Sequence, residues 1–163
     1  MTSLDTPLSS TDTRPANGAA TILRIALGVM FLSHSLILKL YVFTLAGNAA
    51  FFQKLGLPAW MGTATFAAEA VGGVLLVLGV QTRWVAAALQ PILAGAVWAH
   101  SGNGWMFGYP NGGWEYPLYL VVLAVVQIML GDGAYALSRS WLPQGLSAAK
   151  PAFNHSSWTA PAA

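Results

Sequence analysis

Four apolar stretches, separated by short polar segments, predict that this chain is helical. They cover about residues 19–43, 60–80, 84–99 and 117–130 of the 163. The first two reach the roughly 20 residues that an α-helix needs to cross a bilayer. The last one, taken alone, would extend only about 21 Å as a helix. It therefore needs extra turns from its flanking residues or a bilayer that adapts locally.

A shorter amphipathic stretch, residues 46–58, separates the first two apolar stretches. Phe51, Phe52 and Leu55 share one face at helical spacing, while Gln53 and Lys54 point away from it. This pattern predicts a short helix lying in the membrane interface. An ordinary loop fits the same residues equally well.

The composition indicates that the apolar stretches face lipid. Hydrophobic residues make up 56% of the chain and charged residues only 7%, whereas a soluble domain has about 25% charged residues. So few charges cannot cover a large core in water, although a subunit coated by partners would also fit. We therefore predict an all-α integral membrane protein, a four-helix bundle in a lipid bilayer, with the short interfacial helix between its first two spans.

Charge and cysteine content narrow the possible partners and cofactors. The net charge is +2 without a basic run, which gives no indication of a nucleic-acid partner. Cysteine is absent, so the chain has no disulfide framework, no thiol nucleophile and no thiolate metal site. We expect no bound metal.

The basic residues predict the orientation of the bundle. Four spans place both termini on one side, and that side then carries five basic residues against two on the other. The positive-inside rule therefore predicts that both termini are cytoplasmic. We expect a disordered tail over residues 1–18, a membrane domain over residues 19–139 and a flexible tail over residues 140–163.

Titratable side chains inside or beside the apolar stretches are the candidates for chemistry. A charge near the middle of the membrane costs about 2.5–3.5 kcal/mol on insertion scales, so Glu69 must be paired, protonated or beside a wet cavity. By depth, His34 is its best partner and Lys39 the next. The titratable side chains expected in the outer half of the membrane form one candidate group. This group either binds a small molecule with a polar headgroup, handles protons, or holds the helices together by polar contacts. Its members are His34, Lys39, Glu69, His100 and Glu115.

Two further groups of residues are predicted to be structural. At the inner edge, Asp132 is expected to form an ion pair with Arg24 or Arg83. Small residues predict close helix contact, and these are Ala68, Gly72, Gly73 and Gly79. Aromatic residues of the loop before the last stretch either anchor it in the interface or cover a ligand, and these are Trp105, Phe107, Tyr109 and Trp114.

Five stretches carry a family resemblance by their order and spacing. They are LRIALGVMFLSHSLILKL (23–40), AAFFQKLGLP (49–58), EAVGGVLLVLGVQTR (69–83), GGWEYPLYL (112–120) and GDGAYALSR (131–139). With them the chain resembles the DoxX family of small four-span membrane proteins. Two positions depart from the family pattern: Ser35 replaces a common glycine, and Arg139 stands where an acid often ends the last motif.

The resemblance implies a bacterial or archaeal inner-membrane protein. Some DoxX relatives are described as membrane subunits of a thiosulfate:quinone oxidoreductase or a terminal quinol oxidase, and others are linked to oxidative-stress responses with soluble redox partners. It thus implies a membrane subunit of a quinone-linked redox system, with a polar outer-half pocket around Glu69 and His34. A quinone would be its ligand, and no cofactor would be bound covalently.

Several readings stay open. Such a subunit would not be a self-sufficient enzyme and would need a soluble or membrane redox partner. A non-catalytic scaffold or assembly partner for a redox or stress-response complex is the alternative, and a small transporter is the next. Four short spans leave little room for alternating access unless the protein forms a homo-oligomer.

Overall fold

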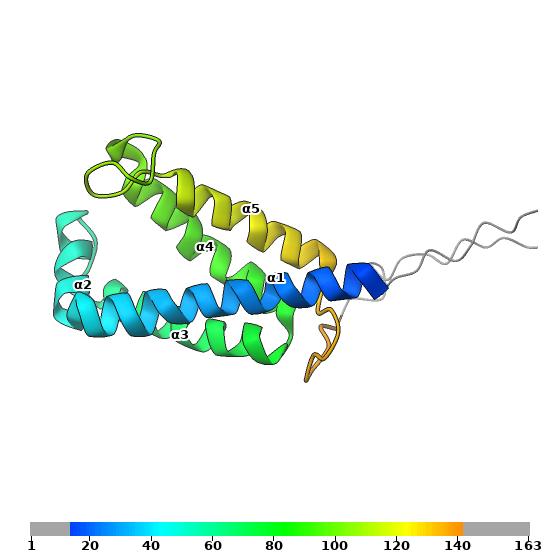
Figure 1. Cartoon of the computed structure of the whole chain (residues 1–163). Coiled ribbons are helices and arrows are strands. Elements are labelled where there is room, and N and C mark those ends of the chain that lie inside the picture. The colour runs from blue at the N-terminus through cyan, green and yellow to red at the C-terminus, as the bar shows by residue number, and fades with distance from the viewer. Residues whose placement is uncertain (1–13, 142–163) are drawn as a thin grey trace, which may run out of the picture.

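The computed structural model describes residues 14–141 and shows an all-helical chain (Figure 1). Helix α1 continues without a break into η1, a π-helix in which each backbone N–H reaches five residues back. A short 3₁₀ helix, η2, follows α4. The elements are α1 Arg14–Leu32, η1 Ser33–Val42, α2 Thr44–Lys54, α3 Trp60–Leu78, α4 Thr82–His100, η2 Ser101–Asn103 and α5 Glu115–Leu130. No extended strand occurs among the described residues, and the all-α prediction is confirmed.

Two of these helical stretches are long and apolar enough to cross a membrane. They are α1 with η1, of 29 residues, and α3, of 19 residues. Helix α5 is apolar but has only 16 residues. Helix α4 has 19 residues and contains Pro91. The prediction of four spans is thus supported in part by helix length and composition, and the full count stays a prediction.

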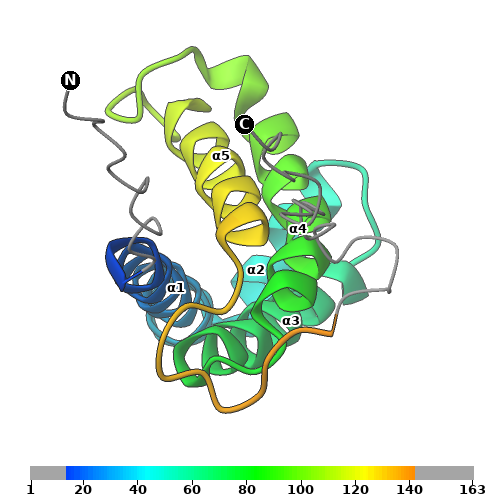
Figure 2. The ribbon, with the colours of Figure 1, turned by 90° about the vertical axis from the view of Figure 1, so that its right-hand side faces the viewer.

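The long helices pack as two antiparallel pairs. Helix α1 lies along α3, and α4 lies along α5 (Figure 1). Contacts between α3 and α4 and between α1 and α5 join the pairs, and the view along the molecule shows the four helices around a common centre (Figure 2). The core is formed by apolar side chains from all four helices, namely Leu27, Phe31, Leu76, Ala86, Leu89, Leu93, Leu120 and Ala124.

Helix α2 corresponds to the amphipathic stretch expected between the first two spans. It is helical over Thr44–Lys54, so the loop alternative is wrong for these residues. Its packing partners are η1 and α3, and it lies across their end opposite to Arg14 (Figure 1). The amide of Asn48 is buried there and donates a 2.7 Å hydrogen bond to the carbonyl of Gly62. The location of α2 in the membrane interface stays a prediction.

Glycines allow α3 to approach its neighbours closely. A Cβ atom on Gly73 would lie 3.0 Å from the carbonyl oxygen of Gly28 in α1. A Cβ atom on Gly72 would lie 2.8 Å from a methyl carbon of Leu89 in α4. Gly79 ends α3 in the left-handed region, with φ of 70°, which favours glycine. Ala68, expected to share this role, is exposed instead. Its side chain is rotated by about 100° from that of its buried neighbour Glu69.

The chain after α5 closes the inner end of the molecule. Residues 131–141, here called the closing segment, pass along the ends of α1 and of the α3–α4 turn (orange in Figure 2). The backbone N–H of Gln81 donates to the carbonyl of Ser138 at 2.9 Å, and the rings of Trp84 and Trp141 lie 5.3 Å apart. Part of the tail expected after residue 139 is therefore packed against the helices.

The first helix begins within the stretch expected to be an N-terminal tail, and the start of the membrane domain at residue 19 stays a prediction. Helix α1 begins at Arg14, ahead of residue 19, where the membrane domain was expected to begin. Pro15 suits the first turn, where its missing N–H has no helical partner to lose. The rest of the two predicted tails, residues 1–13 and 142–163, lies outside the described residues.

Candidate functional site

Glu69 is held in a buried ion pair between α3 and η1. Its carboxylate Oε1 accepts a hydrogen bond of 2.7 Å from the Nζ of Lys39, and the residue is only 6% exposed. Within the described residues, the second oxygen, Oε2, is buried without a hydrogen-bond partner. The depth in the membrane expected from the sequence favoured His34 as the partner of Glu69 and placed Lys39 second. The structure reverses this order because depth along a helix does not fix the rotation of a side chain around it.

His34 instead faces α5. Its ring stacks on that of Tyr116, with centroids 5.8 Å apart and an interplanar angle of 18°. Its Nδ1 lies 3.0 Å from the carbonyl oxygen of Met30. Because a carbonyl can only accept, Nδ1 carries the proton of the neutral ring and Nε2 keeps an acceptor lone pair. His34 therefore offers one free acceptor nitrogen beside an aromatic ring of α5.

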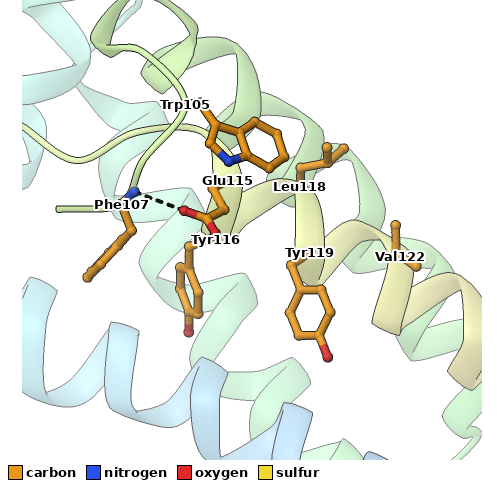
Figure 3. Close-up of a pocket in the computed structure, with 7 residues that line it drawn as sticks. All are labelled: Trp105, Phe107, Glu115, Tyr116, Leu118, Tyr119 and Val122. Carbon is orange, nitrogen blue, oxygen red and sulfur yellow. Dashed lines mark hydrogen bonds between the residues drawn. The ribbon is translucent and has the colours of Figure 1, made fainter. Parts of the chain in front are cut away.

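A pocket of about 530 Å³ lies beside the first turns of α5. Figure 3 shows its lining, which comes from the loop after η2 and from α5. The residues that line it are Trp105, Phe107, Glu115, Tyr116, Leu118, Tyr119 and Val122. Tyr116 joins this pocket to His34, since the same ring stacks on the imidazole and lies 5.5 Å from the ring of Phe107.

The pocket changes from polar to apolar along α5. Glu115 lies at the first residue of the helix, and its Oε2 accepts a 3.2 Å hydrogen bond from the backbone N–H of Phe107 (Figure 3). Leu118 and Val122 lie one and two turns further along the helix. A molecule that fills the pocket therefore meets the Glu115 carboxylate at one end and the aliphatic groups of Leu118 and Val122 further along, with the phenols of Tyr116 and Tyr119 between Glu115 and Val122.

The remaining outer-half candidate, His100, belongs to the loop. Its Nδ1 lies 3.1 Å from the carbonyl oxygens of Asn111 and of Gly112. The amide of Asn103 donates to the same two carbonyls, at 3.1 and 2.9 Å. The expected outer group is thus divided among three places: the Lys39–Glu69 pair, the His34–Tyr116 stack beside the pocket, and the His100 loop.

The inner-edge arginines contact carbonyl groups. Arg24 donates from Nη1 to the backbone oxygen of Asp132 at 3.0 Å, and Arg83 donates from Nη1 to the carbonyl of Ile128 at 2.9 Å. Neither forms a salt bridge with the Asp132 side chain in residues 14–141. Arg24 is still attracted by the negative charge of Asp132, but the hydrogen bonds of both arginines go to the end of α5 and to the closing segment, where free carbonyls attract cations.

The Asp132 carboxylate is satisfied by neutral donors. It accepts from the backbone N–H of Thr82 at 3.0 Å and from the backbone N–H and hydroxyl of Ser140 at 2.8 and 2.7 Å. Burial acts to raise the pKa of Asp132, but the hydrogen bonds from Ser140 and Thr82 outweigh it and hold the pKa below its ordinary value of 3.8. The carboxylate is therefore ionised at neutral pH.

Four of the seven residues that line the pocket were not predicted from the sequence. The loop aromatics Trp105 and Phe107 were considered as a ligand cover, and Glu115 as a ligand-handling residue. Tyr116, Leu118, Tyr119 and Val122 were not considered. Tyr119 lies four positions after Glu115 and three after Tyr116, which is the spacing of neighbours on one side of a helix. In residues 14–141 no three metal-ligating side chains gather as a candidate metal site.

Comparison with known proteins identifies a family for this chain. A family model described as DoxX matches residues 19–102, about half of the chain. No curated protein and no solved structure matched it. The matched region contains His34, Lys39, Glu69 and His100, whereas the pocket residues lie beyond its end.

Proposed function

This chain belongs to the DoxX family of membrane proteins, and from that premise we propose that it is the membrane subunit of a quinone-linked redox system. The pocket beside α5 receives the quinone ring. The single observation that supports this ligand is the mixed pocket lining, with the Glu115 carboxylate at the start of α5, the Tyr116 and Tyr119 phenols after it, and the aliphatic Leu118 and Val122 along the same helix.

A quinone suits this lining because it combines a flat polar ring with an apolar tail. Ligand sites typically surround an apolar body with a few polar groups that fix its orientation. The rings of Trp105, Phe107 and Tyr116 supply flat surfaces for stacking. The hydroxyl of Tyr116 and the carboxylate of Glu115 supply polar contacts for the ring oxygens, and Val122 lies on the path of the tail.

His34 supports a role in proton transfer at the ring. Its Nε2 is an acceptor, because Nδ1 is committed to the Met30 carbonyl. The imidazole lies against the same Tyr116 ring that lines the pocket. When a bound quinol loses a hydroxyl proton, His34 is the proposed acceptor behind the Tyr116 ring, and the Glu115 carboxylate is a second base in the pocket lining itself. The electrons pass to a redox partner, soluble or membrane-bound, which the proposal requires.

The proposed setting is the inner membrane of a bacterium or archaeon, with both termini in the cytoplasm. This follows from the excess of basic residues on the side of the termini and from the two ends of the described chain, which lie at the same end of the molecule (Figure 1). A homo-oligomer is compatible with this setting.

Binding of a redox-inert quinol analogue tests the proposal. The full chain in detergent is titrated with an alkyl-hydroxyquinoline N-oxide, and binding is followed by calorimetry. Tyr116→Leu is expected to weaken binding several-fold, since an aromatic contact contributes about 0.5–1.5 kcal/mol beyond buried area. Tyr135→Leu is the matched control, because Tyr135 is 93% exposed on the closing segment, and it should bind as the wild type does.

Two results would overturn the proposal. The wild-type protein could fail to bind the analogue, or the two tyrosine variants could bind it equally well. Either result would favour the scaffold function, which requires no small-molecule ligand and predicts instead that a partner protein is recovered with the chain from detergent.

A further inference from the structure

The pocket beside α5 places one carboxylate among four aromatic side chains. The backbone N–H of Glu115 donates to the carbonyl of Trp105 at 3.0 Å, and its Oε2 accepts from the backbone N–H of Phe107 at 3.2 Å. The ring of Phe107 lies 5.5 Å from that of Tyr116. Tyr119 follows about one turn further along α5 and lines the same pocket. These contacts hold the carboxylate close to the aromatic rings (Figure 3).

The Glu115 carboxylate is left without a basic partner. Within residues 14–141 it forms no salt bridge, and none of the seven residues that line the pocket has a basic side chain. Its Oε2 holds Phe107, while its Oε1 accepts no hydrogen bond from the described residues. The first turn of α5 supplies only the partial positive charge of a helix N-terminus. The pocket therefore carries a negative charge that a bound cation would offset.

The surrounding rings favour one kind of cation. An aromatic face attracts a cation that lies within about 6 Å of the ring centroid, and a quaternary ammonium group is the usual organic ligand of such rings. That group has no N–H donor, so it requires ring faces and one opposite charge. A calcium ion would instead require about six to eight oxygen ligands, and residues 14–141 hold no group of three metal-ligating side chains. The lining therefore suits a quaternary ammonium group.

The pocket also has room for an apolar chain attached to such a head. Phe107, Tyr119 and Val122 line it and are exposed at the surface of the molecule. Further along α5, Val126 and Met129 are exposed as well. In a membrane protein this exposed apolar side of α5 faces lipid. A chain that leaves the pocket can therefore follow α5 into the bilayer.

We propose that the pocket binds a quaternary ammonium group carried on an apolar chain. The head lies beside Oε1 of Glu115 and against the rings of Trp105 and Tyr116, and the chain follows α5. This inference goes beyond the proposed function, because the ligand is a cation and a quinone is not. The two ligands exclude each other from the pocket. The same head occurs on free alkylammonium ions and on choline lipids, and the experiment separates these sources.

Binding of hexyltrimethylammonium tests the inference. The full chain is placed in nanodiscs of phosphatidylethanolamine and phosphatidylglycerol, which contain no choline. Binding of the radiolabelled probe is measured by equilibrium dialysis, and uptake by empty nanodiscs is subtracted. The wild type is expected to bind saturably. Glu115→Gln removes the charge and should weaken binding roughly tenfold. Trp105→Leu removes an aromatic face and should weaken it several-fold.

Matched controls separate the site from general uptake by the membrane. Trp60→Leu replaces an exposed tryptophan that lies outside the pocket, and it should bind the probe as the wild type does. Glu115→Asp keeps the charge and should keep most of the affinity, also if Glu115→Gln fails to fold. The uncharged isostere 2,2-dimethyloctane, in which carbon replaces the nitrogen, should displace the probe poorly.

The outcomes are distinct. Displacement of the probe by dihexanoylphosphatidylcholine supports a choline lipid as the ligand, and failure to displace it supports a free alkylammonium ion. The inference is overturned if the wild type shows no saturable binding or if Glu115→Gln binds normally. Equal loss in Trp60→Leu and Trp105→Leu, or equal displacement by the isostere, also overturns it. The proposed function is tested separately with the quinol analogue and does not depend on these results.

Discussion

The Asp132 carboxylate caps the start of helix α4 at Thr82. Its Oδ1 accepts a 3.0 Å hydrogen bond from the backbone N–H of Thr82, a residue fifty positions earlier in the chain. Thr82 is the first residue of α4, where backbone N–H groups lack helical acceptors and a negative charge is favourable. The same carboxylate holds Ser140. One side chain therefore joins the start of α4 to the closing segment.

Replacing Asp132 by asparagine should destabilise the protein at neutral pH but hardly in acid. Asparagine keeps one acceptor oxygen but removes the negative charge, which at a helix N-terminus contributes about 0.3–1 kcal/mol. The folded-state pKa of Asp132 lies below its ordinary value of 3.8. The carboxylate therefore contributes stability that is fully present above that value and is lost as the pH falls through the folded-state pKa. Thermal unfolding in detergent should show a melting-temperature gap between wild type and Asp132→Asn that closes below pH 4. A gap that stays constant from pH 7 to pH 3 would contradict this role.

Gly73→Ala should separate α1 from α3. The new Cβ would lie 2.9 Å from Leu32 and 3.0 Å from the backbone of Gly28, and overpacking of this kind costs about 1–3 kcal/mol. Gly95→Ala is the control, because a Cβ on Gly95 of α4 meets nothing within 4 Å. There the substitution should stabilise the helix by about 0.5–1 kcal/mol. Thermal unfolding of the two variants should therefore shift in opposite directions, and equal shifts would argue against close contact at Gly73.

The two single substitutions in the Lys39–Glu69 pair should together destabilise the protein more than the double substitution does. Lys39→Met or Glu69→Gln alone leaves one buried group without its partner, at a cost of about 3 kcal/mol. In the double variant neither charge is left without its partner. It should therefore be more stable than the sum of the two single effects predicts. A double-mutant cycle measured by chemical unfolding in mixed micelles gives this coupling. Strict additivity would mean that the 2.7 Å contact contributes nothing.

Cysteine labelling should establish the membrane topology. The chain contains no cysteine, so each introduced thiol is the only one. Gln53 on α2 is exposed, and Tyr135 on the closing segment is 93% exposed. If α3, α4 and α5 all cross the membrane, these positions lie on opposite sides. A membrane-impermeant maleimide should label Gln53→Cys in intact spheroplasts and Tyr135→Cys only after permeabilisation. Labelling of both from outside would exclude three crossings between them.

The helices were predictable because their apolar stretches are long. The expected stretch 60–80 became α3, Trp60–Leu78, and the stretch 117–130 became most of α5. The position of Glu69 on the packed face of α3 also follows from helical periodicity, since Glu69, Gly72, Gly73 and Leu76 form one stripe and are all buried. These features depend on the spacing of residues along one helix, which a sequence displays directly.

The contacts of the site were less predictable because they depend on rotation and on distant loops. No signal in the sequence marks η1 as a π-helix. An α-helix assumed over these residues gives the wrong rotation of Lys39 relative to His34. Asp132 was matched to arginines by charge, whereas backbone N–H groups of α4 and of the closing segment lie closer to it. Tyr116 was overlooked because its role arises only when α5 packs beside η1.

The brevity of α5 bears on the lipid around the protein. Its 16 residues amount to about 24 Å of helix, which falls short of a typical hydrocarbon core of about 30 Å. Where α5 crosses the membrane, the leaflets must dimple towards each other along that flank, while the 29 residues of α1 and η1 impose no such strain. Short-chain lipids should therefore collect beside α5. In a membrane of longer lipids, two copies of the protein would reduce the hydrophobic mismatch by associating through their α5 sides.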